Sequence, residues 1–303
     1  MELEFKPVVA GDIDRLRPFY GMRPNKTCDS VFLDSFLWKD YYHVQCAVSE
    51  GRAALWLMEK DGRVSTAMPL CREEDLPYFF QQMVDYFSEV LHKPFYISLA
   101  DEEAVQYLNL DPALFEVEEQ VDLKDYLYSG EELRKLEGKK FVKKRNHLNG
   151  FKRMYEGRYE YRRLCCSDRH EVWQFMESWR QHKEEVGAME LSLDYEVAGI
   201  HDILKNCSSL YVRMAGVYID GQLEAFTIGS LNVRENMAVI HIEKANPEIR
   251  GLYQFINQQF LINEFPQAEL VNREDDVGME GLRKAKMSYY PIGFARKYMV
   301  RER

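Results

Sequence analysis

The sequence predicts a protein of mixed α/β (α+β) class, built from two similar lobes, each a mixed sheet flanked by helices, and joined by a basic helix. The main observation is that one order of expected strands and helices occurs twice along the 303 residues. A hydrophobic content of 46% and an aromatic content of 13% supply enough apolar side chains for a core in each lobe. We therefore expect a first lobe at 1–130, a basic connecting helix at 131–157 and a second lobe at 158–303.

The first lobe is expected to begin with a strand at 3–7 and helices at 13–20 and 30–38. Three strands follow, and the turn dipeptide Asp61-Gly62, a strong hairpin signal, joins the last two: 43–49, 53–60 and 63–70. Helices and strands then alternate, with a helix at 73–91, a strand at 95–99, a helix at 102–110 and a strand region at 115–128.

The second lobe repeats this order. A strand at 159–165 precedes helices at 168–184 and 193–205, and Asp220-Gly221 joins a hairpin of strands at 210–219 and 223–231. The remaining elements are a strand at 237–244, a helix at 250–263, a strand at 270–272, a helix at 280–288 and a strand at 294–300. Leu252, Phe255 and Ile256 show the three- and four-residue spacing of an apolar helix face.

Basic residues are concentrated between the two lobes. Residues 134–163 contain twelve Lys or Arg and three Glu, a net charge of +9, whereas the whole chain carries −10. Phe141, Leu148, Phe151 and Tyr155 recur at helical spacing, so we expect a helix with one apolar face. The candidate nucleic-acid- or anion-binding residues are Lys139, Lys140, Lys143, Lys144, Arg145, His147, Lys152 and Arg153. A solvated helix between the lobes is the alternative.

The overall charge and the cysteines limit the class of protein. A net charge of −10 argues against binding of nucleic acid by the whole surface. The six cysteines have no CxxC motif and no metal-ligand spacing, so we expect reduced thiols, no metal site and a cytoplasmic protein. No apolar run approaches the roughly 18 residues of a membrane-spanning helix, and the acidic start predicts no signal peptide.

The junction between the strand at 237–244 and the helix at 250–263 is a candidate anion site. Backbone N–H groups at the start of such a helix bind phosphates in many α/β folds. Asn246 can cap this helix, while Arg250 and Gly251 can bring a cation and a close-approaching backbone to a phosphate. An ordinary capped helix explains the same residues equally well.

Two polar residues share one face of the strand at 237–244. His241 and Glu243 are two positions apart, and side chains alternate along a strand, so both point to the same side. We expect His241 to contact substrate and Glu243 to take a proton from an attacking amine. A buried ion pair of Glu243 with a Lys or an Arg is the alternative.

Charged residues crowd the end of the strand at 270–272, which is typical of a pocket for a polar ligand. We expect Asn272, Arg273 and Glu274 to bind a substrate ammonium or a ribose hydroxyl, and Asp275 to help deprotonate the nucleophile. A solvated charged loop is the alternative.

The short helix at 280–288 carries two cations on one face. Arg283 and Lys286 are three positions apart, so both can reach one anionic centre. A cation there would stabilise an oxyanion or bind a phosphate. Arg283 and Lys286 are therefore our catalytic candidates for the oxyanion, beside Glu243 and Asp275 for the proton.

Five segments carry a resemblance to known proteins: 139–152 (KKFVKKRNHLNGFK), 241–251 (HIEKANPEIRG), 253–257 (YQFIN), 271–278 (VNREDDVG) and 281–291 (GLRKAKMSYYP). The chain resembles an uncharacterised bacterial family of free-standing proteins related to the C-terminal domain of phosphatidylglycerol lysyltransferases. Residues 281–289 are also similar to the Gly-Leu-x-x-Phe-Lys-x-x-Phe pattern of Fem-type peptidoglycan aminoacyltransferases. Lys286 matches the lysine that lies near the transferred ester, Tyr289 matches the last aromatic residue, and Ala285 stands in place of phenylalanine.

The repeated element order is that of the Gcn5-related N-acyltransferase fold, and two tandem copies are the architecture of transferases that use aminoacyl-tRNA. The resemblance implies an active site in the second lobe, aminoacyl-tRNA as donor, no tightly bound cofactor, and an amine or hydroxyl acceptor on a small molecule or a lipid. One alternative is an acyl-CoA-dependent N-acyltransferase, whose Arg/Gln-x-x-Gly-x-Gly/Ala loop is incomplete here because Arg250 is followed directly by Gly251. The other is a non-catalytic protein that binds RNA or a membrane surface.

Overall fold

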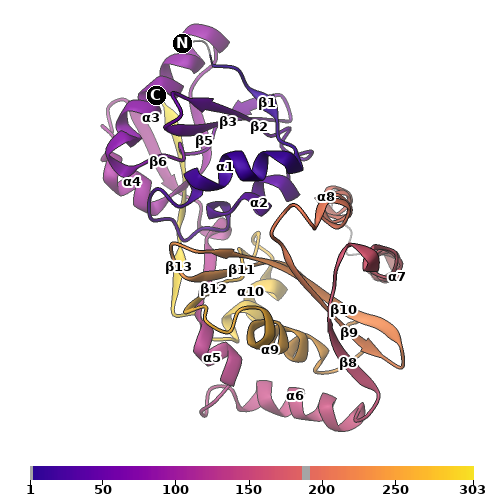
Figure 1. The fold of residues 1–303 in the computed structure, drawn as a ribbon. Helices are drawn as coiled ribbons and strands as arrows, with labels where there is room; N and C mark the ends of the chain where they lie inside the picture. The colour runs from indigo at the N-terminus through magenta and orange to yellow at the C-terminus, as the bar shows by residue number, and fades with distance from the viewer. Residues whose placement is uncertain (1–2, 186–191) are drawn as a thin grey trace.

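The computed structural model describes residues 3–185 and 192–303 and shows two lobes, one above the other in Figure 1. The first lobe contains the strands β1 (Lys6–Pro7), β2 (Gln45–Ser49), β3 (Ala53–Lys60) and β4 (Arg63–Ser65), paired in that order. A second group is ordered β5 (Tyr96–Asp101), β14 (Lys297–Glu302), β6 (Phe115–Glu119), and a parallel bridge from Thr66 to Ile97 connects it to the region after β4.

Helices cover both faces of the first lobe, because alternate residues of β3 are apolar on both sides. Ala54 and Trp56 share a core with α1 (Ile13–Tyr20) and α2 (Phe32–Leu37). Ala53 and Leu55 pack instead with α3 (Leu76–Asp85), its π-helical continuation η4 (Tyr86–Leu91) and α4 (Glu102–Leu108). The helix α1 and the strand β3 have the bounds that the sequence predicts, 13–20 and 53–60.

The second lobe is a seven-stranded sheet in the order β13 (Gly293–Ala295), β7 (Asp125–Ser129), β12 (Leu270–Asn272), β11 (Met237–Ala245), β10 (Gln222–Asn232), β9 (Arg213–Ile219), β8 (Tyr159–Arg163). Phe226 and Ile228 of β10 pack with α7 (Arg169–Glu185) and α8 (Ser192–Asn206). Ala225 lies on the opposite face with α9 (Leu252–Glu264). The order of strands repeats that of the first lobe, which confirms the predicted two-lobe α/β fold.

The two lobes exchange strands. β7 follows β6 in the chain but pairs with β12 and β13 of the second lobe. In return β14, at the C-terminal end of the described chain, pairs with β5 and β6 of the first lobe. The predicted strand regions 115–128 and 294–300 are therefore each divided between two sheets, and the sheets cross the boundary expected near residue 130.

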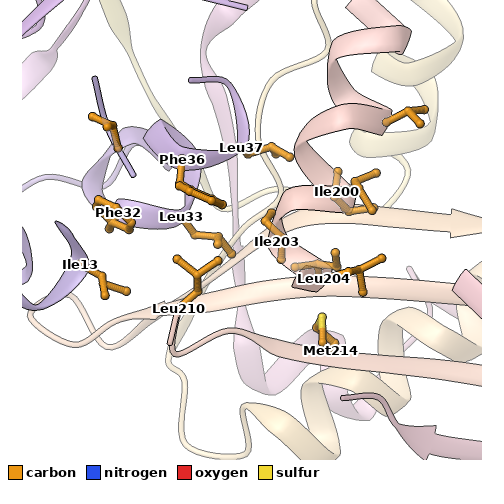
Figure 2. Packing of buried hydrophobic residues seen from close by; sticks show 14 of the residues in the cluster. Ile13, Phe32, Leu33, Phe36, Leu37, Ile200, Ile203, Leu204, Leu210 and Met214 are labelled. Carbon is orange, nitrogen blue, oxygen red and sulfur yellow. The ribbon is translucent and has the colours of Figure 1, made fainter. Parts of the chain in front are cut away.

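One hydrophobic core continues from lobe to lobe (Figure 2). Ile13, Phe32 and Phe36 of the first lobe lie in one cluster with Ile203 and Met214 of the second, and all are less than 6% exposed. A Cβ on Gly199 of α8 would lie 2.2 Å from the carbonyl oxygen of Leu37, so α8 can approach α2 this closely only with glycine there. The lobes are thus packed against each other as one unit.

The predicted connecting helix is two helices. α5 (Gly130–Lys135) ends where Leu136 takes a left-handed conformation, and α6 (Val142–Met154) begins after Gly138, which also has positive φ. The last helix, α10 (Glu280–Met287), follows β12 and precedes β13 along the chain. Within the described residues, no helix is both long and apolar enough to cross a membrane.

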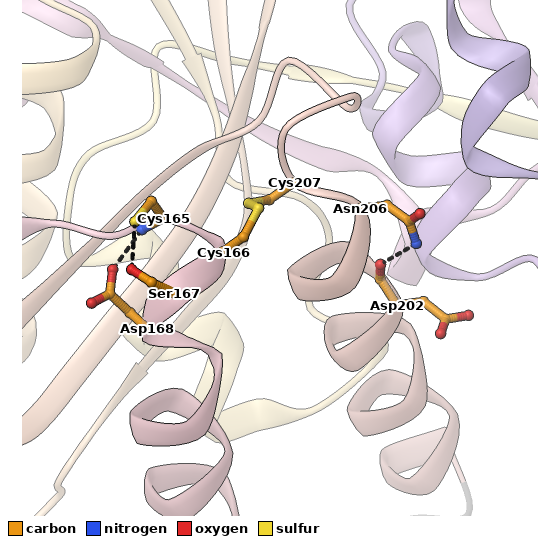
Figure 3. Close-up of a disulfide and its surroundings, with 7 residues drawn as sticks. All are labelled: Cys165, Cys166, Ser167, Asp168, Asp202, Asn206 and Cys207. Atoms are coloured by element: carbon orange, nitrogen blue, oxygen red, sulfur yellow. Dashed lines mark hydrogen bonds between the residues drawn. A yellow bond between two sulfur atoms is a disulfide. The ribbon is translucent and has the colours of Figure 1, made fainter.

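Cys166 and Cys207 form a disulfide that links the start of α7 to the end of α8 (Figure 3). The prediction of reduced thiols is wrong for this pair, because packing of α8 beside α7 brings together cysteines that are 41 residues apart. Cys28, Cys46 and Cys71 are buried free thiols, and Cys165 is an exposed one. The cytoplasmic expectation relied on that argument and stays a prediction.

Candidate active site between the lobes

The candidate site lies where β11 and β12 separate. The two strands pair in parallel only from Met237 to Val239 and from Leu270 to Asn272. Beyond this point β11 continues without β12, whereas the chain after Asn272 stays beside β7, where the N–H of Arg273 donates to the carbonyl of Tyr126 over 3.1 Å. Strands that part in this way leave a gap at their carboxyl ends, the usual ligand position in α/β sheets.

A cavity of about 1000 Å³ opens from this gap toward the first lobe. Both lobes line it, and the aromatic rings in its wall include Trp38, Tyr41, Tyr42, Trp56, Trp179 and Tyr253. Eight residues predicted for the site from sequence also line it, namely Lys144, His241, Glu243, Arg273, Glu274, Asp275, Lys286 and Tyr289.

His241 is held as a neutral imidazole. Its side chain is completely buried, with Nδ1 2.9 Å from Oε1 of Glu274 and Nε2 2.8 Å from Oγ of Ser230. Burial lowers the pKa of His241 to about 3. Burial also raises the pKa of Glu274 well above its usual value, so burial favours the uncharged form of both side chains.

Glu243 is one half of a buried ion pair, which was the alternative to a free base. Arg273 Nη2 donates to its Oε1 over 2.9 Å, and Asn257 Nδ2 donates to its Oε2 over 2.8 Å. The other guanidinium nitrogen, Nη1 of Arg273, is buried and has no hydrogen-bond partner among the described residues. The Arg273 guanidinium carbon lies 4.8 Å from the centroid of the Tyr289 ring.

Lys286 is buried at the edge of the cavity, with 8% of the residue exposed. Its Nζ donates to the carbonyl of Arg273 over 2.6 Å and also to the carbonyl of Asp275. Burial lowers the pKa of Lys286. An ammonium has three donors, so one N–H remains for a ligand.

Arg283 does not reach the same centre as Lys286, and the prediction that both serve one anion is wrong. Its guanidinium donates to both oxygens of Asp276 over 2.9 Å and to Asp122 over 2.7 Å. The hydrogen bonds from Arg283 hold the pKa of Asp276 down at about 2. Tyr126 Oη also donates to Asp276, so this group shapes the loop after β12 instead of lining the cavity.

Asn272 is likewise structural. It is completely buried, donates from Nδ2 to the carbonyl of Lys26 over 2.8 Å, and accepts the N–H of Glu274 over 2.7 Å. Its predicted contact with substrate does not fit this position, because Nδ2 donates to Lys26 and to Asp125 and Oδ1 already accepts a hydrogen bond. Asp275, in contrast, faces the cavity, and burial raises the pKa of its carboxyl.

The predicted anion site at the start of α9 is occupied by the protein itself. Gly251 has a φ of 91°, and a Cβ there would lie 2.3 Å from the carbonyl oxygen of His147 on α6. Asn246 donates from Nδ2 to Glu224 over 2.9 Å and lines a second cavity of about 590 Å³. Arg250 is exposed. Gly251 therefore serves the close approach of α6, not of a phosphate.

The basic residues of the connecting segment differ in their surroundings. Lys139, Lys143 and Arg153 are exposed to solvent, and Lys152 is half-buried. Lys140 pairs with Glu132, and Arg145 donates to the carbonyl of Gly138 over 2.7 Å. Lys144 alone in this set points into the cavity, where Nζ lies 3.8 Å from the centroid of the Tyr289 ring.

Acidic residues of the first lobe form the wall that sequence reasoning missed. Asp29 and Asp34 line the cavity, and burial raises the pKa of both carboxyls. Asp34 interrupts an apolar helical run, VFLDSFL at 31–37, and a lone charge in such a run was the available signal. Cys28, Asp34 and Glu274 each place one potential metal-ligand atom within 4.8 Å of the others, but the Lys297 ammonium lies 3.2 Å from Cys28 Sγ.

Solved structures with a similar fold cover nearly the whole chain. A protein of unknown function from Bacteroides thetaiotaomicron has a TM-score of 0.90 and 26% identity, with 100% of both chains covered. L-PGS from Bacillus licheniformis has a TM-score of 0.69 and 15% identity, covering 99% of this chain and 94% of that one. FemX has a TM-score of 0.63 and 10% identity, covering 98% of this chain and 96% of that one. At these identities the similarity to L-PGS and to FemX shows the fold. The predicted Fem-like fold of two lobes is thereby confirmed.

The sequence comparisons show the family. An uncharacterised protein of Mycoplasmoides gallisepticum is 28% identical over 178 residues, which are 58% of this chain and 56% of that relative's length. The family model described as "Phosphatidylglycerol lysyltransferase, C-terminal" matches residues 23–301. The chain therefore belongs to the family of phosphatidylglycerol lysyltransferase C-terminal domains.

Proposed function

We propose that this protein moves an aminoacyl group from aminoacyl-tRNA to an amine or hydroxyl acceptor in the cavity between the lobes. The observation that carries the proposal is the buried Lys286 ammonium, which keeps one N–H free at the edge of a cavity large enough for an aminoacyl ester. Family membership supports a transferase, and Lys286 occupies the position that the Fem-type pattern assigns to a lysine near the ester.

The reaction would be attack on the ester carbonyl. The acceptor nitrogen or oxygen forms a bond to the carbonyl carbon, the carbonyl oxygen becomes an oxyanion, and the bond to the ribose oxygen then breaks. Lys286 donates to the oxyanion, and a donor aimed at developing charge contributes about 10²–10³ in rate. The acceptor gives its proton to a base, and the ribose oxygen takes one up as it leaves.

Asp275 is the better placed base. Its carboxyl faces the cavity, and burial raises its pKa toward the range in which a base works well near neutral pH. Glu243 already accepts hydrogen bonds on both oxygens, so its role is to hold Arg273 in place. His241 of β11 and Glu274, which follows β12, would contact the substrate where these two strands separate.

The donor would reach the site along α6. Lys139, Lys143 and Arg153 are exposed on this side of the molecule, and such cations attract the phosphates of RNA. Acyl-CoA fits less well as donor, because α6 covers the start of α9 and Gly251 has no space beside it. In the first lobe, the corresponding helix start carries Glu73, Glu74 and Asp75, which would repel a pyrophosphate.

The test uses hydroxylamine as a surrogate acceptor, since the natural one is unknown. Purified protein is incubated with tRNA charged with labelled amino acids, and aminoacyl hydroxamate is measured above the spontaneous rate. Lys286→Met should lower the enzymatic rate about 10²–10³-fold while tRNA binding persists. Lys284→Ala on the exposed side of α10 is the matched control and should keep full activity.

Three results would contradict the proposal. Aminoacyl transfer would be excluded as the function if hydroxamate formed no faster with protein than without it for every amino acid tested. Thermal stabilisation by acyl-CoA and not by charged tRNA would favour the acyl-CoA alternative. Salt-sensitive RNA binding without any turnover would favour the non-catalytic binding protein.

A further inference from the structure

Two cations from distant parts of the chain meet at one aromatic ring inside the cavity. Lys144 Nζ lies 3.8 Å and the guanidinium carbon of Arg273 4.8 Å from the centroid of the Tyr289 ring. Lys144 comes from α6 and Arg273 from the residue after β12, and both line the cavity. Tyr289 is 5% exposed, so the ring is a fixed wall.

The charges at this place are not balanced by the protein. Glu243 is the carboxylate that pairs with Arg273, and its second oxygen is already taken by Asn257. Lys144 donates to Ser288 Oγ over 2.6 Å and has no ion pair among the described residues. Two positive charges therefore face one negative charge, and two donors of Lys144 remain uncommitted.

Arg273 adds an orphaned donor. Its side chain is 13% exposed, Nη2 is committed to Glu243, and Nη1 is buried without a hydrogen-bond partner among the described residues. A buried donor with no partner is costly, so each such group in a native structure calls for an explanation, and a bound anion or water is one. Burial and the nearby charge of Arg273 also lower the pKa of Lys144 to about 8, as expected for cations without enough counter-charge.

We propose that Lys144 and Arg273 form a subsite for a phosphodiester inside the cavity, with Tyr289 as its wall. One surplus positive charge matches one phosphodiester anion. A guanidinium nitrogen and an ammonium can each donate to a different phosphate oxygen. The substrate that supplies this phosphate is identified through the proposed function.

The donor RNA is the source that the structure favours. α6 carries Lys144 toward the cavity and Lys143 toward solvent, with Lys139 and Arg153 also exposed. Cations therefore continue from the interior subsite along the outer surface, as a chain with one phosphate per nucleotide requires. The subsite would hold the last phosphodiester of the tRNA and so place the terminal ribose ester near Lys286.

The test measures binding of cytidylyl-3′,5′-adenosine, which has the single phosphodiester of a tRNA 3′ end, by calorimetry at fixed salt. Lys144→Met should weaken its binding at least about tenfold, as loss of a charge-assisted hydrogen bond predicts. Arg273→Lys keeps the charge but loses Nη1, and should weaken it as well. Lys284→Met, which removes an exposed lysine that pairs with Glu280 on α10, is the matched control and should change the affinity less than about twofold. Adenosine, which lacks a phosphate, should bind equally to wild type and Lys144→Met.

A second measurement uses only the wild-type protein, so it does not require that a variant folds. The Lys144 ammonium, read by NMR in the wild-type protein, should show a rise in pKa from about 8 when the dinucleotide is added. The charged or titratable groups that face it are Arg273, Glu243, His147 and Tyr289. An unchanged Lys144 pKa at saturation, equal binding by wild type and Lys144→Met, or an equal loss in Lys284→Met would each overturn the subsite.

The remaining outcomes separate the subsite from the proposed function. Binding of glycerophosphoglycerol, a phosphodiester that carries no nucleoside, through Lys144 and without binding of the dinucleotide would keep the subsite and overturn its assignment to the donor. Dinucleotide binding through Lys144 without any hydroxamate formation would keep the subsite and contradict aminoacyl transfer. Hydroxamate formation with binding that ignores Lys144 and Arg273 would refute the subsite and leave the proposed function intact.

Discussion

Asp125 and Lys297 are the first residues of the two exchanged strands, β7 and β14, and they form an ion pair at the centre of the molecule. Asp125 is 0% and Lys297 1% exposed, and Lys297 Nζ lies 2.7 Å from Oδ1 of Asp125. Asp125 Oδ2 also accepts the N–H of Cys28 over 2.6 Å and Nδ2 of Asn272 over 3.0 Å. One side chain thus connects both sheets and the first-lobe wall of the cavity.

Asp125→Asn should cost roughly 3 kcal/mol of unfolding free energy. Removal of one partner from a buried ion pair costs about 3–5 kcal/mol, because the other charge is left without compensation. Two further carboxylates are close to Lys297 Nζ, Asp275 at 3.6 Å and Asp29 at 3.9 Å, so we expect the lower end of that range. The pair raises the pKa of Lys297, so this contribution is present below about pH 10.5 and is lost only as pH rises through the higher folded pKa.

Urea unfolding followed by circular dichroism measures the change, with the midpoint compared at constant m-value. Asp220→Asn removes a carboxylate from the exposed pair with Arg158, where both side chains are 54% exposed, and should change stability by less than about 1 kcal/mol. The double variant with Lys297→Met should lose less than the sum of the two single losses, since it leaves no unpaired charge. A loss below about 1 kcal/mol in Asp125→Asn, or strict additivity, would refute the reasoning.

Two further predictions concern groups around the site. His241 is neutral in the folded protein with a pKa of about 3, whereas its pKa in the unfolded chain is about 6.5. Between these two values only the unfolded chain takes up the proton, so the folded protein becomes less stable as the pH is lowered below about 6.5. Heteronuclear NMR should show its imidazole unprotonated at pH 5, and a titration midpoint above 5 would contradict the burial argument. Gly251→Ala should cost roughly 2–4 kcal/mol in the same urea assay, because its φ is 91° and the new Cβ would lie 2.3 Å from the His147 carbonyl. Gly150→Ala, which meets nothing within 4 Å on α6, should be neutral or stabilising, and equal effects of the two changes would exclude this explanation.

Much of the secondary structure could be predicted from the sequence, because it depends on local spacing. The dipeptide Asp220-Gly221 predicted a hairpin, and both residues take positive φ between β9 and β10. Helical periodicity predicted α9 within two residues of its start. The strand exchange could not be predicted, since the residues of β7 carry no information about which of two similar sheets they will join.

The same limit applies to the site. The two-residue spacing of His241 and Glu243 predicted that they share a face, and both line the cavity. The three-residue spacing of Arg283 and Lys286 predicted a shared helix face, but not that Asp276 would bind the arginine. Spacing reports direction along one element, and the partner across a gap belongs to another element.

The sequence by itself determined the elements, their repetition in two lobes and the family, because each depends on local periodicity or on motifs that are contiguous in the chain. Only the tertiary structure decided that β7 and β14 change lobes, that Cys166 meets Cys207, and that Lys144 faces Arg273 inside the cavity. The physical reason is that such contacts join residues far apart in sequence. Their stability depends on the packing of the whole core and on the burial of charges, which no single segment of the chain contains.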